Sequence, residues 1–219
     1  METSARGAGS GGEPGTIAAW AALLSLTASL TTLVCLTGLH VLSPEFDPSW
    51  RVVSEYALGR HGWALSLMFL AWAIGSWGLA FAIRSEVRTI GGQVGLVLLV
   101  AAGAGEAMAS VFDLRRLAPH NLAAAVAIPS LPIAATLISV SLGRTRRWRP
   151  ASRAMLWAAN LTWFSLAVMA AAMFSLHRKA GAPRVPIGWP NRLLIVIYCT
   201  WVIVVAWHAI RLRGRDCDG

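Results

Sequence analysis

Charged residues are scarce in this sequence: Asp, Glu, Lys and Arg together make up 13% of its 219 residues, against about 25% in ordinary soluble domains. Acidic residues are the scarcest, with ten Asp and Glu against nineteen Lys and Arg. Hydrophobic residues, by contrast, make up 56% of the chain. This composition excludes an ordinary soluble domain and is typical of a protein that lies within a lipid bilayer.

Cysteines and catalytic motifs are also scarce. The three cysteines, Cys35, Cys199 and Cys217, form no C-x-x-C pair, so we predict neither a disulfide nor a cysteine-based metal site. The sequence contains no H-x-x-x-H or H-E-x-x-H spacing for a metal and no G-x-S-x-G around a serine nucleophile. No motif therefore identifies a reaction or a substrate, and we expect no cofactor.

Six long apolar stretches occupy most of the chain. A bilayer core is about 30 Å thick, so a helix that rises 1.5 Å per residue needs about 20 apolar residues to span it. The stretches that meet this length are about 16–42, 62–83, 90–111, 121–142, 154–176 and 191–210. The first is too long for a signal-peptide core, and no A-x-A cleavage site follows it. We predict an all-α integral membrane protein, a six-helix bundle.

The predicted organisation is a single transmembrane domain over residues 16–211. Residues 1–15, rich in Gly, Ser and Ala, are predicted to be a disordered leader, and residues 212–219 a cytoplasmic tail. Placing the N-terminus inside puts eleven Lys and Arg on the cytoplasmic side and eight outside. The positive-inside rule therefore favours both termini in the cytoplasm, in a plasma membrane of bacterial type.

The largest cluster of positive charge lies between the fourth and fifth stretches. Its five members are Arg144, Arg146, Arg147, Arg149 and Arg153. An RNA-binding loop would need aromatic residues for base stacking, and only Trp148 is present. We therefore predict membrane lipid as a partner, and no nucleic acid. The sequence identifies neither a small ligand nor an oligomeric state.

Two apolar stretches carry residues that affect helix geometry. The third begins with a G-x-x-x-G pattern, Gly91 to Gly95, which predicts a close approach of two helices within the bundle. The fourth contains Pro129 and Pro132, each of which removes a backbone hydrogen bond. We expect its outer half to kink or open, and exposed carbonyl groups there to face protein or a wet cavity.

Polar residues gather at the predicted outer face. Glu106, Ser110 and Asp113 have the i, i+4, i+7 spacing of a single helix face. A carboxylate inside a membrane segment is costly, so we expect Glu106 to face the bundle interior and to be protonated or paired. The expected partner is Arg192, and the alternatives are Arg115 and Arg116. Four histidines fall at the same boundary: His40, His61, His120 and His177.

The connection after the first stretch carries the most distinctive motif, SEYALGRHGW at residues 54–63 after HVLSPEFDPSW. Further along are Phe112-Asp113, His120 at the start of the fourth stretch, and Gly188-x-x-x-Arg192 with Trp201 beyond. These features resemble a prokaryotic six-helix membrane family catalogued as domain of unknown function 998. The resemblance implies six helices and one outer constellation formed by Ser54, Tyr56, Gly59, Asp113, His120 and Arg192. It also leads us to expect an acidic residue before Arg192, where this chain has Asn191.

We interpret the chain as a multi-pass membrane protein without enzymatic activity. Its outward-facing polar pocket is expected to bind or pass a small ligand, a proton or a lipid headgroup. The candidate ligand-binding residues are Ser54, Glu55, Tyr56, Glu106, Asp113, His120 and Arg192. One alternative is a metal-dependent hydrolase of a lipid or amide, with Asp113, His120 and a third histidine, such as His61, as ligands. Another is a structural subunit of a membrane complex, in which the polar cluster only caps the bundle.

Overall fold

The computed structural model describes residues 13–176 and 185–217, with side chains over 16–175 and 185–214. This part of the chain forms six long helices joined by connections that contain two short 3₁₀ helices, and each long helix is long and apolar enough to span a membrane. The elements are α1 (Glu13–Leu42), η1 (Val53–Leu58), α2 (Gly62–Ile83), α3 (Ile90–Val111), α4 (Leu117–Gly143), η2 (Arg149–Ala151), α5 (Ser152–Leu176) and α6 (Gly188–Cys217). The predicted fold class, an all-α six-helix membrane bundle, is confirmed.

Helix ends agree with the apolar stretches for α2 and α3 and extend beyond them elsewhere. α1 begins at Glu13, so residues 13–15 belong to the helix and not to the predicted leader. α6 continues to Cys217, so most of the predicted tail is helical. The apolar pattern marks the part of a helix suited to lipid, whereas its backbone hydrogen bonds continue until a residue or turn interrupts them.

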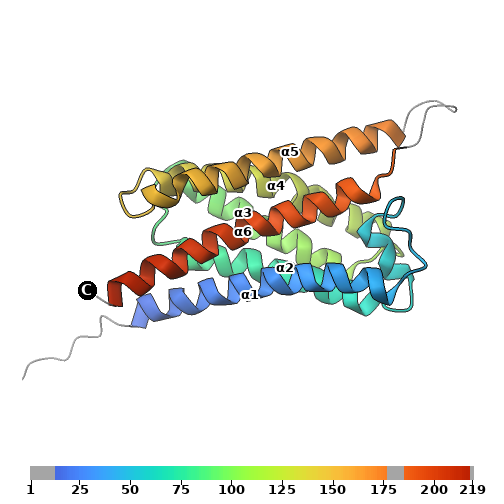
Figure 1. The fold of residues 1–219 in the computed structure, drawn as a ribbon, viewed down its shortest axis with the longest axis horizontal. Coiled ribbons are helices and arrows are strands. Elements are labelled where there is room, and N and C mark those ends of the chain that lie inside the picture. Colours follow the sequence, from blue (N-terminus) through green and yellow to red (C-terminus); the bar gives the residue numbers. More distant parts are fainter. Residues whose placement is uncertain (1–12, 177–184, 218–219) are drawn as a thin grey trace, which may run out of the picture.

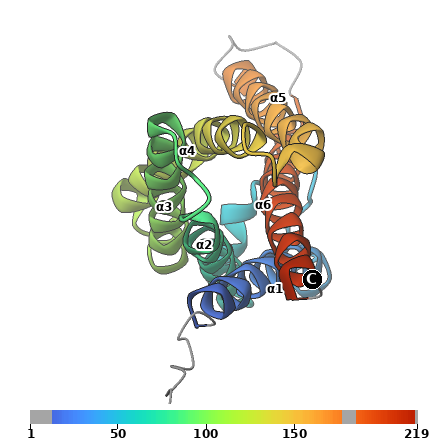
Figure 2. The ribbon, with the colours of Figure 1, turned by 90° about the vertical axis from the view of Figure 1, so that its left-hand side faces the viewer.

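The six helices pack in chain order around a ring, and α6 closes the ring against α1 (Figure 2). The start of α1 and the end of α6 lie at one end of the bundle (Figure 1). The connection that contains η1, the α3–α4 turn and the start of α6 lie at the other end. We call this second end the η1 end.

Small residues allow neighbouring helices to approach closely. Ser25 Oγ of α1 donates a hydrogen bond of 2.7 Å to the carbonyl oxygen of Gly75 in α2, and a Cβ on Gly75 would lie only 2.7 Å from Ser29 Oγ. A Cβ on Gly95 would lie 3.0 Å from Ile138 and 3.1 Å from Leu137. The predicted use of the G-x-x-x-G pattern, contact inside the bundle, is therefore confirmed between α3 and α4.

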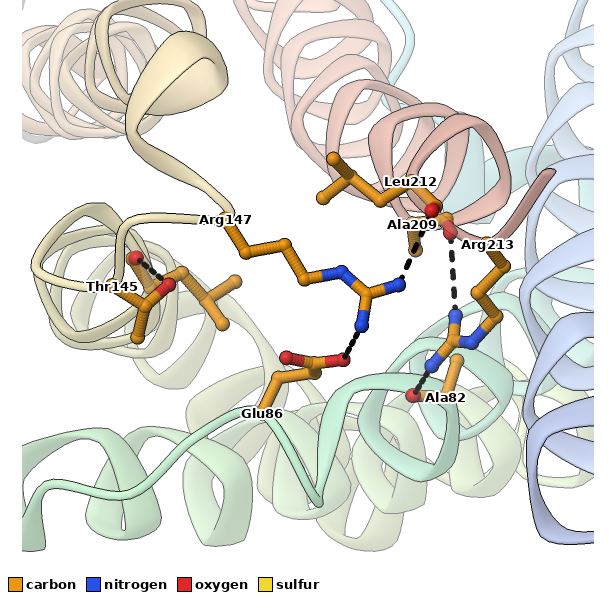
Figure 3. Close-up of polar contacts among 8 residues, drawn as sticks. Ala82, Glu86, Thr145, Arg147, Ala209, Leu212 and Arg213 are labelled. Carbon is orange, nitrogen blue, oxygen red and sulfur yellow. Dashed lines mark hydrogen bonds and ion pairs between the residues drawn. The ribbon is translucent and has the colours of Figure 1, made fainter. Parts of the chain in front are cut away.

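At the end opposite η1, two arginines connect α2, α6 and the two connections beside them (Figure 3). Arg147, in the α4–α5 connection, pairs with Glu86 at 3.3 Å and donates to the carbonyl oxygen of Leu212 at 3.2 Å. Arg213 of α6 donates to the carbonyl oxygen of Ala82 at 2.6 Å. These contacts fix the end of α6 against α2 and the two connections beside it.

The two prolines of α4 do not interrupt the helix, which runs from Leu117 to Gly143. Pro132 has no N–H, so the carbonyl oxygen of Ile128, four residues earlier, loses its usual helical partner. Tyr198 of α6 supplies the missing donor, because its hydroxyl group donates to Ile128 O at 2.8 Å. The proline thus creates an acceptor that ties α4 to α6.

Replacing Tyr198 by phenylalanine should destabilise the bundle by about 1 kcal/mol, because the Ile128 carbonyl is left unpaired inside the membrane. Unfolding by dodecyl sulfate in mixed micelles would measure the loss. The matched background is Pro132→Ala, which restores an N–H to the carbonyl. In that background the same substitution should cost much less, and an equal cost in both backgrounds would contradict the pairing.

Candidate functional site

A cavity of about 70 Å³ lies at the η1 end, between η1, α2, α3, α4 and α6. Its polar lining consists of Ser54, Trp72, Glu106, His120, Asn191 and Tyr198, and the rest is mainly alanine and other apolar residues. The volume corresponds to about two water molecules at about 30 Å³ each in the liquid. Sites for drug-sized ligands are several times larger, about 300–1,000 Å³. The cavity therefore suits a small polar group or the polar end of a longer molecule.

Ser54 and His120 form the most specific contact of the cavity. His120 Nδ1 lies 2.8 Å from the carbonyl oxygen of Phe112, and its Nε2 lies 3.2 Å from Ser54 Oγ. A carbonyl oxygen only accepts, so the hydrogen atom must be on Nδ1, and in the neutral ring Nε2 accepts from the serine hydroxyl. The α3–α4 turn supplies Phe112 and α4 begins just before His120, so this short connection holds the ring in place. His120 is buried and Ser54 is half-buried.

Asn191 also lines the cavity, from the first turn of α6. Its Oδ1 accepts a hydrogen bond of 2.8 Å from the backbone N–H of Val53, next to Ser54. This bond identifies the oxygen and so fixes the orientation of the side-chain amide. The Nδ2 group has no hydrogen-bond partner among the described residues, so two N–H donors remain available.

Glu106 is the most deeply placed charged residue of the site. It is only 2% exposed, and Ser76 Oγ of α2 donates to its Oε2 at 2.9 Å. The predicted pairing with Arg192 is wrong, and so are the alternatives, since Arg115 pairs with Asp113 and Arg116 lies over the Phe112 ring. In the described part of the chain, no lysine or arginine lines the cavity. Glu106 therefore contributes an acceptor without a neighbouring cation.

Trp72 lines the same cavity from α2. Its ring stacks on Phe69 and meets Tyr198 edge-on, with centroid distances of 6.4 and 6.3 Å. Its indole Nε1 is buried and has no hydrogen-bond partner within the described residues. Trp72 therefore contributes an aromatic surface to the cavity lining, while its N–H group is enclosed by the protein.

Arg192 forms a buried network next to the cavity. Its guanidinium donates to His40 Nε2 at 2.7 Å and to the Tyr56 hydroxyl at 2.9 Å. It also donates to the carbonyl oxygens of Arg51 at 2.8 Å and Gly188 at 2.9 Å. His40 Nδ1 donates to Leu36 O at 2.7 Å, so Nε2 is free to accept. The network joins the connection after α1 to α1 and α6, and it holds η1 above the cavity.

The predicted site residues thus fall into three groups. Ser54, Glu106 and His120 line the cavity. Tyr56 and Arg192 belong to the adjoining network. Two form more exposed ion pairs at the same end: Glu55 with Arg51 at 2.9 Å and Asp113 with Arg115 at 2.8 Å.

The metal alternative needs three ligands that converge. In the part of the chain that the structure describes, no three His, Cys, Asp or Glu side chains are grouped closely enough to hold a metal ion. Asp113, His120 and His61 are therefore not brought together, and both nitrogens of His120 already have partners. His177, one of the other candidate ligands, lies outside the described residues. The arrangement does not fit a metal centre, and we derive no chemistry from one.

Sequence reasoning missed three residues of the cavity: Trp72, Asn191 and Tyr198. Asn191 carried a signal, because it is polar at the start of an apolar stretch and stands where an acidic residue was expected. Tyr198 carried a weaker one, as one of only two tyrosines in the chain. Nothing distinguishes Trp72 from the other ten tryptophans.

The fold defines a multi-pass integral membrane protein with a small cavity between its helices. The chain belongs to the family described as "Protein of unknown function (DUF998)", whose sequence profile matches residues 26–208. The resemblance seen in the sequence is therefore confirmed. No curated protein and no solved structure matches the chain.

Proposed function

We propose that this protein binds a small polar molecule, or the polar end of a larger one, in the cavity at the η1 end. The observation that carries the proposal is the set of unused hydrogen-bonding groups around one cavity. Asn191 Nδ2 is a donor without a partner among the described residues, and the Glu106 carboxyl group has none at Oε1 among them. Polar groups inside a membrane segment are costly unless they serve a function.

The chemistry of the lining favours a particular kind of ligand. The two N–H donors of Asn191 require an acceptor, such as a carbonyl or hydroxyl oxygen. Among the described residues, the cavity lining includes no lysine or arginine, so an anion would find no charged partner there. We therefore propose an uncharged or cationic ligand that carries a hydrogen-bond acceptor.

We further propose that the η1 end faces the outside of the plasma membrane. The four arginines of the α4–α5 connection and Arg153 at the start of α5 lie at the opposite end of the bundle, with the start of α1 and the end of α6. Cytoplasmic connections carry an excess of Lys and Arg. This orientation gives the cavity access to extracellular solutes and outer-leaflet headgroups.

Cysteine accessibility tests this proposal. In a variant without native cysteines, Ala109→Cys places a thiol on the cavity lining from α3. The matched control is Ala104→Cys, which is exposed on the same helix but does not line the cavity. A membrane-impermeant cationic methanethiosulfonate, added outside intact cells, should block the first thiol at least about tenfold faster, because lipid keeps a thiol protonated and unreactive. Equal rates, or no reaction at position 109, would overturn the proposal.

A further inference from the structure

We propose that Ser54, His120 and Asn191 form an acyl-transfer site that hydrolyses short-chain carboxylic esters. The inference rests on the proposed function, since it requires that the cavity admits a small polar group, and it names the chemistry of that group. It needs no metal and no cofactor. It differs from the metal-dependent hydrolase, because the nucleophile is the serine itself.

Ser54 and His120 have the geometry of a nucleophile and its general base. The distance of 3.2 Å from Ser54 Oγ to His120 Nε2 allows direct proton transfer. The Phe112 carbonyl fixes the hydrogen atom on Nδ1 and so presents the basic lone pair of Nε2 to the serine. A backbone carbonyl thus takes the orienting position that a carboxylate occupies in Ser-His-Asp sites.

Asn191 supplies the donor that such a reaction needs. Its Oδ1 is held by the backbone N–H of Val53, one residue before the nucleophile, so its free Nδ2 group belongs to the same small cavity as Ser54. An amide N–H group stabilises the negative oxygen of a tetrahedral intermediate. An aspartate at this position would still accept from Val53 but would have no hydrogen atom to donate. The departure from the expected acidic residue is therefore what makes the site complete.

The proposed hydrolysis uses water as its only co-substrate. Ser54 Oγ attacks the ester carbonyl carbon while its proton passes to His120 Nε2. The bond to the leaving alkoxide oxygen then breaks, and that oxygen takes the proton as the alcohol departs. Water attacks the acyl-serine in the same way, with His120 accepting and returning its proton, and releases the carboxylic acid and free Ser54.

The size of the cavity limits the length of the acyl group that the substrate can carry. A volume of about 70 Å³ holds an acetyl group but not a long chain. The two oxygens of an ester only accept, which matches the unused N–H donors of Asn191 Nδ2. Ser54 lies in η1, outside the membrane-spanning helices, where water can reach the acyl-serine.

Labelling by a fluorophosphonate probe tests the nucleophile in the full-length protein in detergent micelles. The probe should label wild-type protein, and Ser54→Ala should abolish labelling. The matched control is Ser110→Ala, because Ser110 lies at the same end but donates to Ala107 O and does not line the cavity. It should be labelled like wild type. Absence of wild-type labelling, or labelling that survives Ser54→Ala, would overturn the inference.

Turnover tests the oxyanion donor and the acyl length. p-Nitrophenyl acetate should be hydrolysed, and p-nitrophenyl decanoate at least about tenfold more slowly. Asn191→Asp retains the acceptor for Val53 and so preserves the local fold, yet should lower turnover by about 10²–10³-fold. Full activity in this variant, or hydrolysis of the decanoate faster than that of the acetate, would contradict the proposed acyl-transfer site. If the thiol of Ala109→Cys reacts with the methanethiosulfonate but the fluorophosphonate does not label Ser54, the proposed binding cavity is supported and only the acyl-transfer chemistry is refuted.

Discussion

Replacing Arg192 by methionine should destabilise the protein by about 4 kcal/mol, the largest effect that we expect of a single polar residue. The methionine retains the apolar stem but removes every hydrogen bond of the guanidinium. Four acceptors then lose their donor: His40 Nε2, the Tyr56 hydroxyl, and the carbonyl oxygens of Arg51 and Gly188. Each unpaired buried acceptor costs about 1 kcal/mol or more. Unfolding by dodecyl sulfate in mixed micelles measures the change.

The controls separate the network from a general loss of packing. Tyr56→Phe removes one acceptor from Arg192 and should cost only about 1 kcal/mol. Arg192→Lys keeps the charge, but a single ammonium group cannot reach acceptors on three sides, so its cost should lie between the other two. If Arg192→Met lowered the free energy of unfolding by less than about 1 kcal/mol, the network would not be what holds this end of the bundle together.

Replacing Gly188 by alanine should cost about 3 kcal/mol, because the new Cβ meets backbone atoms that cannot rotate away. It would overlap the carbonyl oxygen of Pro48 and lie 2.8 Å from that of Arg51. The Gly188 N–H also donates to Ser49 O at 2.9 Å, so the start of α6 and the connection after α1 touch through their backbones. We expect the connection to shift away from α6 and to weaken the Arg192 network as well.

The same unfolding measurement checks this prediction, with Gly38→Ala as the matched control. Gly38 lies inside α1, and a Cβ there would meet nothing within 4 Å. Alanine favours a helix over glycine by about 1 kcal/mol, so the control should be neutral or slightly stabilising. If both substitutions behaved alike, the close backbone contact at Gly188 would be refuted.

The sequence was sufficient to locate the helices. A helix that spans a bilayer must have a certain length and be apolar, and both properties can be recognised in the local composition. The ends of α2 and α3 agree with the apolar stretches to the residue. The loop motif at 54–63 correctly pointed to the family and to one end of the bundle. Helix ends beyond the apolar region, as in α6, could not be read in the same way, since polar residues also continue a helix.

The partners of the polar residues could not be read from the sequence. Glu106 pairs with Ser76 and not with Arg192, and His120 contacts Ser54 although 66 residues separate them. Composition and spacing therefore determined that this chain is a six-helix membrane protein with polar groups at one end. Only the packing of η1, α2, α3, α4 and α6 decided which of them meet, because a hydrogen bond depends on distances of a few tenths of an ångström. Helix periodicity sets the face of a residue but not its neighbour across the bundle.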